Sequence, residues 1–230
     1  MIENKTVLAI IPARGGSKRL PKKNVLDLAG RPLISWTISA AKNSKYVDRV
    51  VVSTDNDEII RIAKHSMADV PFKRNAGLSS DTATTEDVIK DCLERLGEAY
   101  DVVVVLQPTS PLRTVEDIDT ALEMMKDTEV QGIVSVVQLE HPLIWCNTLP
   151  EDRSMADFMK PEYIGMRSQD FPASYRINGA IYIYTLEKLY RSGMLLDKGV
   201  YAYVMPKERS VDIDERVDFM IADAILRLQV

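Results

Sequence analysis

The sequence has few of the residues that cross-link small domains or form metal and redox centres. It has only two cysteines, Cys92 and Cys146, and their wide separation fits no metal-binding or disulfide-exchange spacing. We expect both to be free thiols, as is usual in a reducing compartment. With only two histidines, His65 and His141, the chain offers no Ser-His-Asp or Cys-His arrangement for nucleophilic catalysis.

Long apolar runs and an excess of positive charge are missing as well. No run approaches the roughly 18 apolar residues of a membrane-spanning helix. The polar start of the chain is followed by a short apolar run, 6–11, which is too short for a signal peptide. The 34 acidic and 29 basic residues leave a net charge of −5, which argues against nucleic acid or an anionic membrane as the main partner. We therefore expect a soluble cytoplasmic protein.

What the chain has is the composition of an ordinary globular protein. Of its 230 residues, 46% are apolar and 27% charged, which excludes disorder, collagen and coiled coil as descriptions of the whole. A chain of this length buries roughly 70–75% of its unfolded surface when it folds, so it needs no disulfide bonds or metal ions to be stable. We expect residues 1–230 to form a single domain.

Continuous apolar runs alternate with helix-like stretches up to about Glu140. Such runs predict strands that are buried on both faces of a sheet. The predicted strands are 7–11, 48–53, 101–106 and 132–137, and the predicted helices are 32–43, 57–64, 85–96 and 116–125, the last capped by Thr114. Strands that alternate with helices imply parallel pairs joined by right-handed crossovers. The pattern predicts an α/β fold with a Rossmann-like, doubly wound, mostly parallel sheet.

The alternation is interrupted by residues 141–172, which are irregular and contain four prolines. An irregular stretch of this length inside a compact domain is usually functional or forms a small element of its own. The later elements that we predict are strands at 180–185 and 200–204 and helices at 186–192 and 215–228.

The first predicted strand is followed by a segment dense in cations. Within ten residues it carries five of them, Arg14, Lys18, Arg19, Lys22 and Lys23. Gly15 and Gly16 allow a tight turn, and exposed backbone N–H groups beside cations make an anion site that a triphosphate fits. Ligands of an open parallel sheet bind beyond the carboxyl ends of its strands. The segment therefore predicts a phosphate site, although its spacing is neither that of a Walker A loop nor GxGxxG.

Two further segments carry polar side chains near strand or helix ends. The predicted strand 101–106 is followed by Gln107, Thr109, Ser110 and Arg113. Residues 79–85, SSDTATT, either cap the next helix or form a polar rim that hydrogen-bonds a base.

Asp212 and Asp214 stand two residues apart near the end of the chain. On an extended strand they would point to one face, with Ile213 turned inward. Two adjacent carboxylates repel each other unless a cation lies between them, and oxygen ligands suit Mg²⁺. The pair therefore predicts a magnesium site, the alternative being a solvent-facing strand before the last helix.

Five segments, in this order, resemble one enzyme family: IPARGGSKRLPKKN, LSSDTATT, LQPTSPLR, RINGAIYIY and SVDIDE. Over nearly its whole length the chain resembles the acylneuraminate cytidylyltransferases, which activate nonulosonic acids such as sialic acid as CMP-sugars. It is similar, more loosely, to the cytidylyltransferases for the eight-carbon acid KDO. The resemblance implies that CTP and an acidic nine-carbon sugar react to give the CMP-sugar and pyrophosphate, with Mg²⁺ as cofactor.

The resemblance also implies roles for the residues that match the family's motifs. The matching phosphate-loop residues are Arg14, Ser17, Lys18, Lys23 and Asn24, and the cytosine-contacting ones are Arg74, Ala83 and Thr85. The residues that match the sugar site are Gln107, Thr109, Ser110, Arg167, Arg176, Asn178, Gly179 and Tyr182. Asp212 and Asp214 match metal ligands, and residues 141–172 match a dimerisation element that helps complete the neighbouring subunit's site. The implied assembly is a homodimer.

In the implied mechanism the anomeric hydroxyl of the sugar attacks the α-phosphorus in line, and catalysis is mostly positioning and charge stabilisation. Lys23 and Mg²⁺ on the two aspartates would offset charge on the α-phosphate and on the leaving pyrophosphate. Arg14 and Lys18 would hold the β- and γ-phosphates. Arg167 or Arg176 would pair with the sugar carboxylate. The catalytic groups implied in this way are Lys23, Arg14, Asp212 and Asp214.

One position departs from the family pattern, and other interpretations stay open. After His141, Pro142 and Leu143 the sialic-acid enzymes carry a lysine that contacts the sugar, whereas this chain has Ile144. The lost cation leaves open a legionaminic or pseudaminic acid as acceptor, and it also leaves open a loop whose register is shifted by one residue. A KDO-type or sugar-1-phosphate enzyme is a second interpretation, although the latter class usually shows a GxGTR-like loop. A non-catalytic nucleotide-binding module is a third, because fold alone does not fix function.

Overall fold

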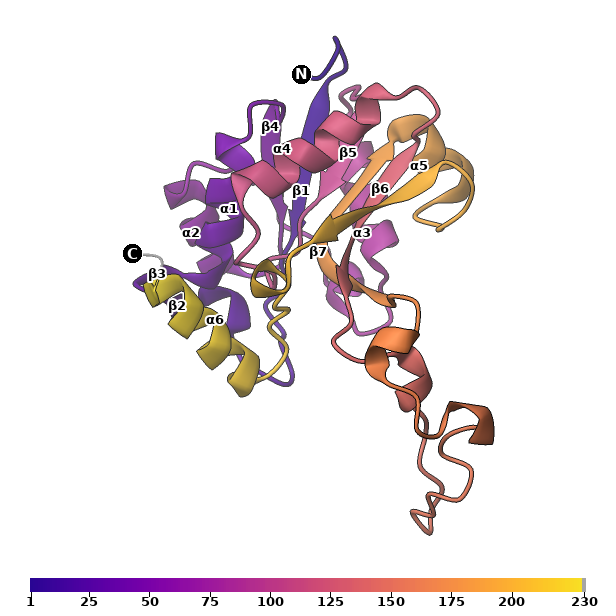
Figure 1. The fold of residues 1–230 in the computed structure, drawn as a ribbon. Helices are drawn as coiled ribbons and strands as arrows, with labels where there is room; N and C mark the ends of the chain where they lie inside the picture. Colours follow the sequence, from indigo (N-terminus) through magenta and orange to yellow (C-terminus); the bar gives the residue numbers. More distant parts are fainter. Residues whose placement is uncertain (229–230) are drawn as a thin grey trace.

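A six-stranded sheet forms the centre of the computed structural model, which describes residues 1–228 (Figure 1). Its strands, in their order across the sheet, are β4 (Arg49–Ser53), β1 (Val7–Pro12), β5 (Val102–Val105), β7 (Tyr175–Thr185), β6 (Gly132–Gln138) and β8 (Val200–Met205). β1 is parallel to both of its neighbours, and β6 is parallel to β8. Only β7 runs antiparallel to the strands beside it. The predicted mostly parallel sheet is confirmed.

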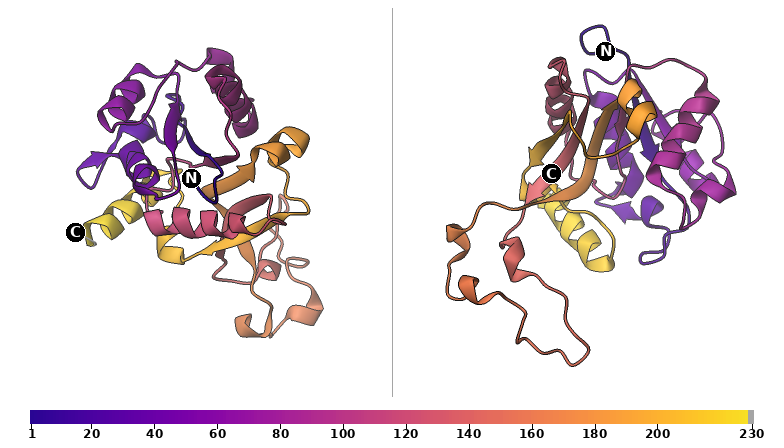
Figure 2. Two further views of the ribbon diagram at one scale, coloured as in Figure 1. Left: turned by 90° about the horizontal axis from the view of Figure 1, so that it is seen from above. Right: turned by 90° about the vertical axis from the view of Figure 1, so that its right-hand side faces the viewer.

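Helices cover both faces of the sheet (Figure 2), which explains the continuous apolar runs. One face is covered by α1 (Leu33–Asn43), α2 (Asp57–His65) and α4 (Val115–Glu123), the other by α3 (Thr85–Leu96) and α5 (Leu186–Ser192). In β1, Ala9 packs with Ile38 of α1, whereas Ile10 on the opposite face packs with Ile89 of α3. Each strand therefore needs apolar residues at every position and not at alternate ones.

A third apolar cluster attaches the last helix to the body. α6 (Arg216–Leu228) packs beside a two-stranded ribbon, β2 (Asp27–Leu28) and β3 (Arg31–Pro32). Buried Phe219 of α6 shares this cluster with Leu28 of the ribbon and with Ile213. Residues 211–214 lie just before α6. This packing holds them against the segment that follows β1.

Most element boundaries lie within two residues of those predicted from the sequence. Thr114 caps α4, as predicted, in a capping box with Asp117. The β2–β3 ribbon was not predicted, and β7 begins at Tyr175 rather than at Ala180. The first three residues of β7, Tyr175–Ile177, are exposed and include Arg176, and a buried polar residue, Asn178, follows them, so no apolar run marks this part of the strand.

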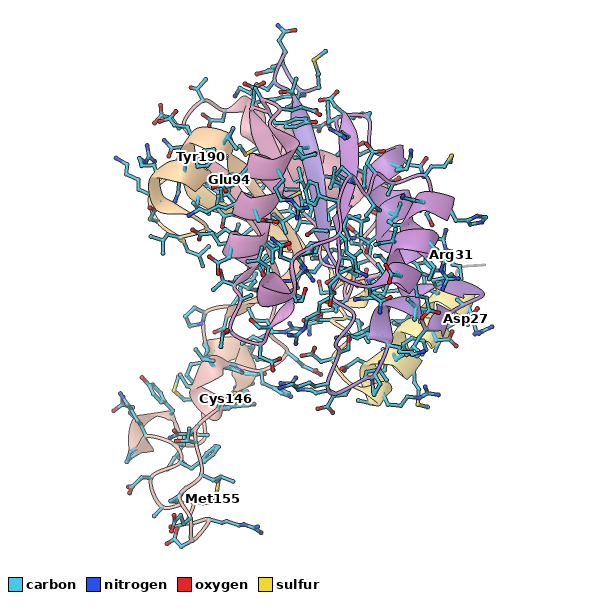
Figure 3. All side chains as sticks on the ribbon, turned by 180° about the vertical axis from the view of Figure 1, so that it is seen from behind. Asp27, Arg31, Glu94, Cys146, Met155 and Tyr190 are labelled. Carbon is cyan, nitrogen blue, oxygen red and sulfur yellow. The ribbon has the colours of Figure 1, made fainter. Side chains whose placement is uncertain are left out.

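Residues 141–172 form an arm that stands away from the sheet (Figures 1 and 2). The arm contains only short 3-10 turns, Leu143–Trp145, Pro161–Tyr163 and Ser168–Asp170. It joins β6 to β7 at the edge of the sheet where β1 and β5 end, because β5 and β6 both run antiparallel to β7. Figure 3 shows Cys146 on the arm nearer the body than Met155.

Both cysteines are free, as predicted, with Cys92 buried and Cys146 exposed. Burial raises the pKa of the Cys92 thiol to about 12, which leaves it protonated and inert. Over residues 1–228, none of the helices has the length and apolar character to cross a bilayer.

Candidate functional site

A cavity of about 540 Å³ lies at the carboxyl ends of β1 and β5. The chain passes from β1 to β4 on one side and then returns to β5 on the other, so the strand order reverses between β1 and β5. Such a switch point opens a crevice for ligands. Twelve of the predicted site residues line the cavity: Arg14, Ser17, Lys18, Lys23, Asn24, Arg74, Ala83, Thr85, Gln107, Thr109, Asp212 and Asp214. Arg19, of the predicted cationic segment, and Ser80 and Asp81, of residues 79–85, also line it, although the family resemblance implied no individual role for these three.

The loop after β1 is fixed by contacts to its backbone. The backbone N–H of Gly15 donates to Oδ1 of Asp55 at 2.9 Å, and Nδ2 of Asn24 donates to the carbonyl oxygen of Arg14 at 3.1 Å. A Cβ atom on Gly15 would lie 2.7 Å from Nδ2 of Asn56, so this position requires glycine. The loop is therefore held at both ends, and four of its cationic side chains, Arg14, Lys18, Arg19 and Lys23, line the cavity.

Each of the five cations of this loop is paired with a carboxylate. The pairs are Arg14–Asp81 at 3.0 Å, Lys18–Asp81 at 2.5 Å, Arg19–Asp214 at 2.8 Å, Lys22–Glu58 at 4.0 Å and Lys23–Asp214 at 3.2 Å. Four of the five pairs converge on two acids that line the cavity, Asp81 and Asp214. Positive and negative groups are thus in direct contact at the wall of the space where a ligand would lie.

Lys23 joins the loop to the segment before α6. It is only 9% exposed, and its Nζ donates to the carbonyl oxygen of Ile213 as well as to Asp214. Ile213 is fully buried, as predicted, and its N–H donates to the carbonyl oxygen of Thr109 at 2.8 Å. The predicted strand over Asp212 and Asp214 does not form, because this segment pairs with a lysine and a loop carbonyl and not with a neighbouring strand.

Asp212 has the properties of a cation ligand. Its Oδ1 atom is buried and accepts no hydrogen bond from the residues that the structure describes. Burial raises the pKa of Asp212, and the charge of Asp214 acts in the same direction, whereas Thr109, Lys23 and Arg176 oppose the shift. A second carboxylate and an unpartnered oxygen fit Mg²⁺, which is usually held by one or two carboxylates together with substrate oxygens. Residues 1–228 contain no cluster of three or more His, Cys, Asp or Glu side chains suited to a metal, so a cation at Asp212 would need those additional oxygens.

Arg74 lies on the opposite side of the cavity beside Ala83 and Thr85. It is only 5% exposed, and its Nε donates to Oγ of Ser79 at 3.1 Å. Burial lowers the pKa of Arg74, and the charge of Asp55, 3.8 Å away, opposes that shift. One terminal nitrogen, Nη2, donates no hydrogen bond within residues 1–228. A buried donor of this kind fits an acceptor such as a carbonyl group of a base.

Residues 79–85 cap the next helix, as one of the two predictions had it, and they also line the cavity. Thr84 caps α3: its hydroxyl accepts from the N–H of Asp87 at 3.1 Å, and its own N–H donates to the Asp87 carboxylate at 3.0 Å. Ser80 and Thr85 line the cavity. The cap fixes one end of the segment, so its polar groups are held at the cavity wall.

Two predicted substrate contacts, Ser110 and Asn178, are placed differently by the structure. Both are almost fully buried, and neither lines the cavity. The amide of Asn178 accepts from Oγ of Ser135 at 2.6 Å and donates to Oγ of Ser210 at 3.0 Å. Asn178 therefore acts within the protein, holding Ser210 and through it the segment that carries Asp212.

Three more predicted sugar contacts also lie outside the cavity lining. Arg176 borders a second cavity, of about 500 Å³, on the other side of Asp212 and Asp214. Tyr182 is half-buried in β7, and burial raises the pKa of its hydroxyl. Arg167 is exposed on the arm and lines neither cavity. Within one copy of the chain, the structure does not bring Arg167 to the other site residues.

Gly179 allows β7 to approach the loop after β5. Its φ of +77° belongs to the left-handed region, and a Cβ atom would lie 2.7 Å from Oε1 of Gln107 and 3.6 Å from Oδ2 of Asp212. Buried Arg113 holds the same loop, because its Nη1 donates to the carbonyl oxygens of Gln107 and Ala180. Because Gly179 has no side chain, the side chain of Gln107 has room to lie against β7 at this point.

We expect Gly179→Ala to lower kcat/KM about tenfold, because the added methyl group displaces Gln107 from the cavity wall. It should also lower the free energy of unfolding by about 1–2 kcal/mol through the left-handed backbone. Gly30→Ala is the matched control, since Gly30 has a φ of +88° and open space around its Cβ position. Steady-state assays and urea unfolding of both variants separate the two effects. Equal activity in the two variants would exclude a positioning role for the Gly179–Gln107 contact.

Comparison with known proteins gives a consistent result. Residues 8–215 match the family model described as cytidylyltransferase. The chain is 34% identical to a pseudaminic acid cytidylyltransferase of Campylobacter jejuni (96% of each chain) and 34% identical to a CMP-N,N'-diacetyllegionaminic acid synthase of Legionella pneumophila (96% and 97%). It is 39% identical to an N-acylneuraminate cytidylyltransferase of Streptococcus agalactiae over 93% of this chain, which spans about half (51%) of that longer relative.

A solved structure shows the same fold at lower sequence identity. CMP:2-keto-3-deoxy-manno-octonic acid synthetase, solved in complex with CTP, superposes with a TM-score of 0.73 at 18% identity. The match covers 98% of this chain and all of that one. At this identity the likeness supports the Rossmann-like α/β architecture alone.

Proposed function

Because the chain belongs to the cytidylyltransferase family, we propose that it joins CTP to a nonulosonic acid, giving the CMP-sugar and pyrophosphate. The observation that carries the proposal is the meeting of the cationic loop after β1 with Asp212 and Asp214 across one cavity. Phosphoryl-transfer sites need cations for the phosphates and carboxylates for a metal ion. The full-length relatives named for pseudaminic and legionaminic acids support the acceptor class.

In the proposed complex, each wall of the cavity binds one part of CTP. Arg14 and Lys18 bind the β- and γ-phosphates, and Lys23, held by Ile213, offsets charge on the α-phosphate. Nη2 of Arg74, which donates no hydrogen bond within residues 1–228, donates to the cytosine. Asp212 and Asp214 would hold Mg²⁺, which when bound supplies positive charge to the phosphate oxygens.

We place the sugar beside Gln107 and Thr109, at the side of the cavity nearest to Asp212. There its anomeric hydroxyl would attack the α-phosphorus in line, with pyrophosphate leaving toward Arg14 and Lys18. Arg176, on the far side of Asp212, is a guanidinium of the kind that pairs with a carboxylate. Ile144, in place of the lysine of the sialic-acid enzymes, favours a legionaminic or pseudaminic acid over sialic acid.

We also propose that the protein works as a homodimer through the arm. Residues 141–172 expose large apolar side chains, among them Leu143, Leu149, Met155 and Ile164, and large apolar side chains that gather on one exposed element favour association with another protein surface. A second copy would cover them and bring its own Arg167 to the cavity. Sedimentation equilibrium tests this proposal, since a monomer at micromolar concentration would contradict it.

Release of pyrophosphate in the presence of Mg²⁺ tests the reaction directly. The acceptors are N-acetylneuraminic, legionaminic and pseudaminic acids and KDO, with UTP and GTP in place of CTP as nucleotide controls. We expect release with CTP and one of the nonulosonic acids, and none when EDTA exceeds Mg²⁺. Release with KDO alone would assign the enzyme to the eight-carbon acids. Silence with every acceptor, while CTP still binds, would favour a nucleotide-binding module.

A further inference from the structure

Asp81 forms ion pairs with Arg14 and Lys18, the two cations to which the proposed function assigns the β- and γ-phosphates. Its Oδ1 atom lies 3.0 Å from Nη1 of Arg14, and its Oδ2 atom lies 2.5 Å from Nζ of Lys18. Nη1 of Arg14 also donates to the carbonyl oxygen of Ser80 at 3.5 Å. One carboxylate thus bridges two cations with its two oxygens, as two oxygens of a phosphate would.

The side chains of this bridge are exposed enough to exchange partners. Relative exposure is 52% for Asp81, 40% for Arg14 and 72% for Lys18. Hydrogen bonds from Lys18 and Arg14 hold the pKa of Asp81 below its usual value, so the carboxylate is charged at neutral pH. Exposed ion pairs contribute little to stability, whereas a triphosphate offers more charge and more acceptors to the same cations. A nucleoside triphosphate therefore displaces Asp81 readily.

The backbone is held on both sides of Asp81, so its exposed side chain can turn without movement of the neighbouring elements. Ser79 accepts a hydrogen bond from buried Arg74, and Thr84 is held in the capping box of α3. Between these points lie Asp81 and its immediate neighbours. The carboxylate can leave the two cations without disturbing Arg74 or the start of α3.

We propose that Asp81 is an internal competitor for the β- and γ-phosphate site, and that it limits the affinity of the cavity for nucleoside triphosphates and for pyrophosphate without affecting its affinity for a monophosphate. The inference rests on the proposed function, which places those phosphates on Arg14 and Lys18. A triphosphate displaces Asp81, whereas a monophosphate has no group at this position and leaves the ion pairs in place. After the reaction the same carboxylate competes with pyrophosphate for both cations and so promotes its release.

Calorimetric titration of Asp81→Asn with three probes, inorganic pyrophosphate, CTP and CMP, tests the proposal. Because the displaced pairs are exposed, the expected effects are moderate. We expect the Kd of pyrophosphate and of CTP to fall about three- to tenfold and the Kd of CMP to stay within twofold. Asp81→Glu keeps the charge and should bind all three probes as the unmodified protein does.

Asp57→Asn is the matched control for net charge, because Asp57 is also exposed, pairs with Lys73 at 2.8 Å and does not line the cavity. It should leave every Kd within twofold. Unchanged or weaker binding of pyrophosphate by Asp81→Asn would overturn the proposal. Equal tightening of CMP and CTP would also overturn it, since that pattern reports general electrostatics and not competition at one subsite.

The titrations distinguish failure of this inference from failure of the proposed function. Binding of inorganic pyrophosphate needs no base and no sugar, so it reports on the two cations whether or not the chain transfers CMP. The acceptor assay with the unmodified protein decides the proposed function separately. In that assay Asp81→Asn should show a three- to tenfold lower inhibition constant for pyrophosphate, with inhibition by CMP unchanged.

Discussion

Asp212→Asn should lower kcat at saturating CTP by about 10²-fold or more, with no loss of folded structure. Asparagine keeps the size of the side chain and removes only its charge. The carboxylate that it replaces has a buried oxygen without a partner among residues 1–228, which is the property that fits a cation beside phosphate oxygens. Removing a preorganised charge stabiliser from an active site typically costs this much.

The measurement is pyrophosphate release at saturating CTP and acceptor, over a range of Mg²⁺ concentrations. Glu208→Gln, at an exposed position that lines neither of the two cavities, is the control and should stay within about twofold of the unmodified enzyme. Near-normal turnover of Asp212→Asn in Mg²⁺ would remove the basis for a metal site at the two aspartates. Unfolding curves of the variant exclude misfolding as the cause of a low rate.

Lys23→Gln should reduce kcat about 10²- to 10³-fold. Lys23 is nearly buried, and its ammonium group is fixed by Ile213 and Asp214 at the cavity wall. A charge placed before the reaction begins needs no reorganisation as the α-phosphate becomes more negative, and such groups contribute most to catalysis. Glutamine retains hydrogen-bonding capacity without the charge, so the change isolates electrostatic stabilisation.

The neighbouring lysine provides the control for this experiment. Lys22 is 75% exposed, and its only described carboxylate partner, Glu58, lies 4.0 Å away. Lys22→Gln removes the same charge from the adjacent position and should change kcat less than threefold. If the two variants lose activity equally, the overall charge of the loop matters and the position of Lys23 does not.

Local patterns predicted the sheet and the position of the cationic loop well. Runs such as residues 7–11 are apolar at every position because helices cover both faces, and that condition leaves a clear mark on the sequence. Density of cations after a buried strand placed Arg14, Lys18 and Lys23 at one end of the sheet. Cavity-lining residues near these signals were therefore predictable.

Contacts between distant segments were not predictable from the same patterns. Asp81 lies in a polar stretch that reads as a helix cap, and only the fold brings its carboxylate to Arg14 and Lys18. Asn178 is polar and lies within a segment that matches a family motif, yet the fold buries it against Ser135 and Ser210. Single positions do not reveal whether a polar side chain faces a ligand or another side chain, because both solutions satisfy its hydrogen bonds.

The position of the arm is a further feature that the sequence did not predict. Its prolines and the lack of an apolar pattern indicated an irregular insertion, and the structure agrees. They did not indicate where the arm would stand relative to the cavity. That position follows from the antiparallel direction of β7, which places both ends of the arm at the ligand-binding edge of the sheet.

The ion pair between Lys23 and Asp214 joins residues 191 positions apart in the chain. Contacts between residues so far apart in the chain form late in folding. The conformational entropy of the long loop between them must be lost before the contact contributes any stabilisation. The two halves of the catalytic cavity therefore meet only when the final segment docks onto the first. During synthesis the growing chain cannot turn over CTP until that segment is made, and in a refolding experiment the return of activity should follow the return of helical structure.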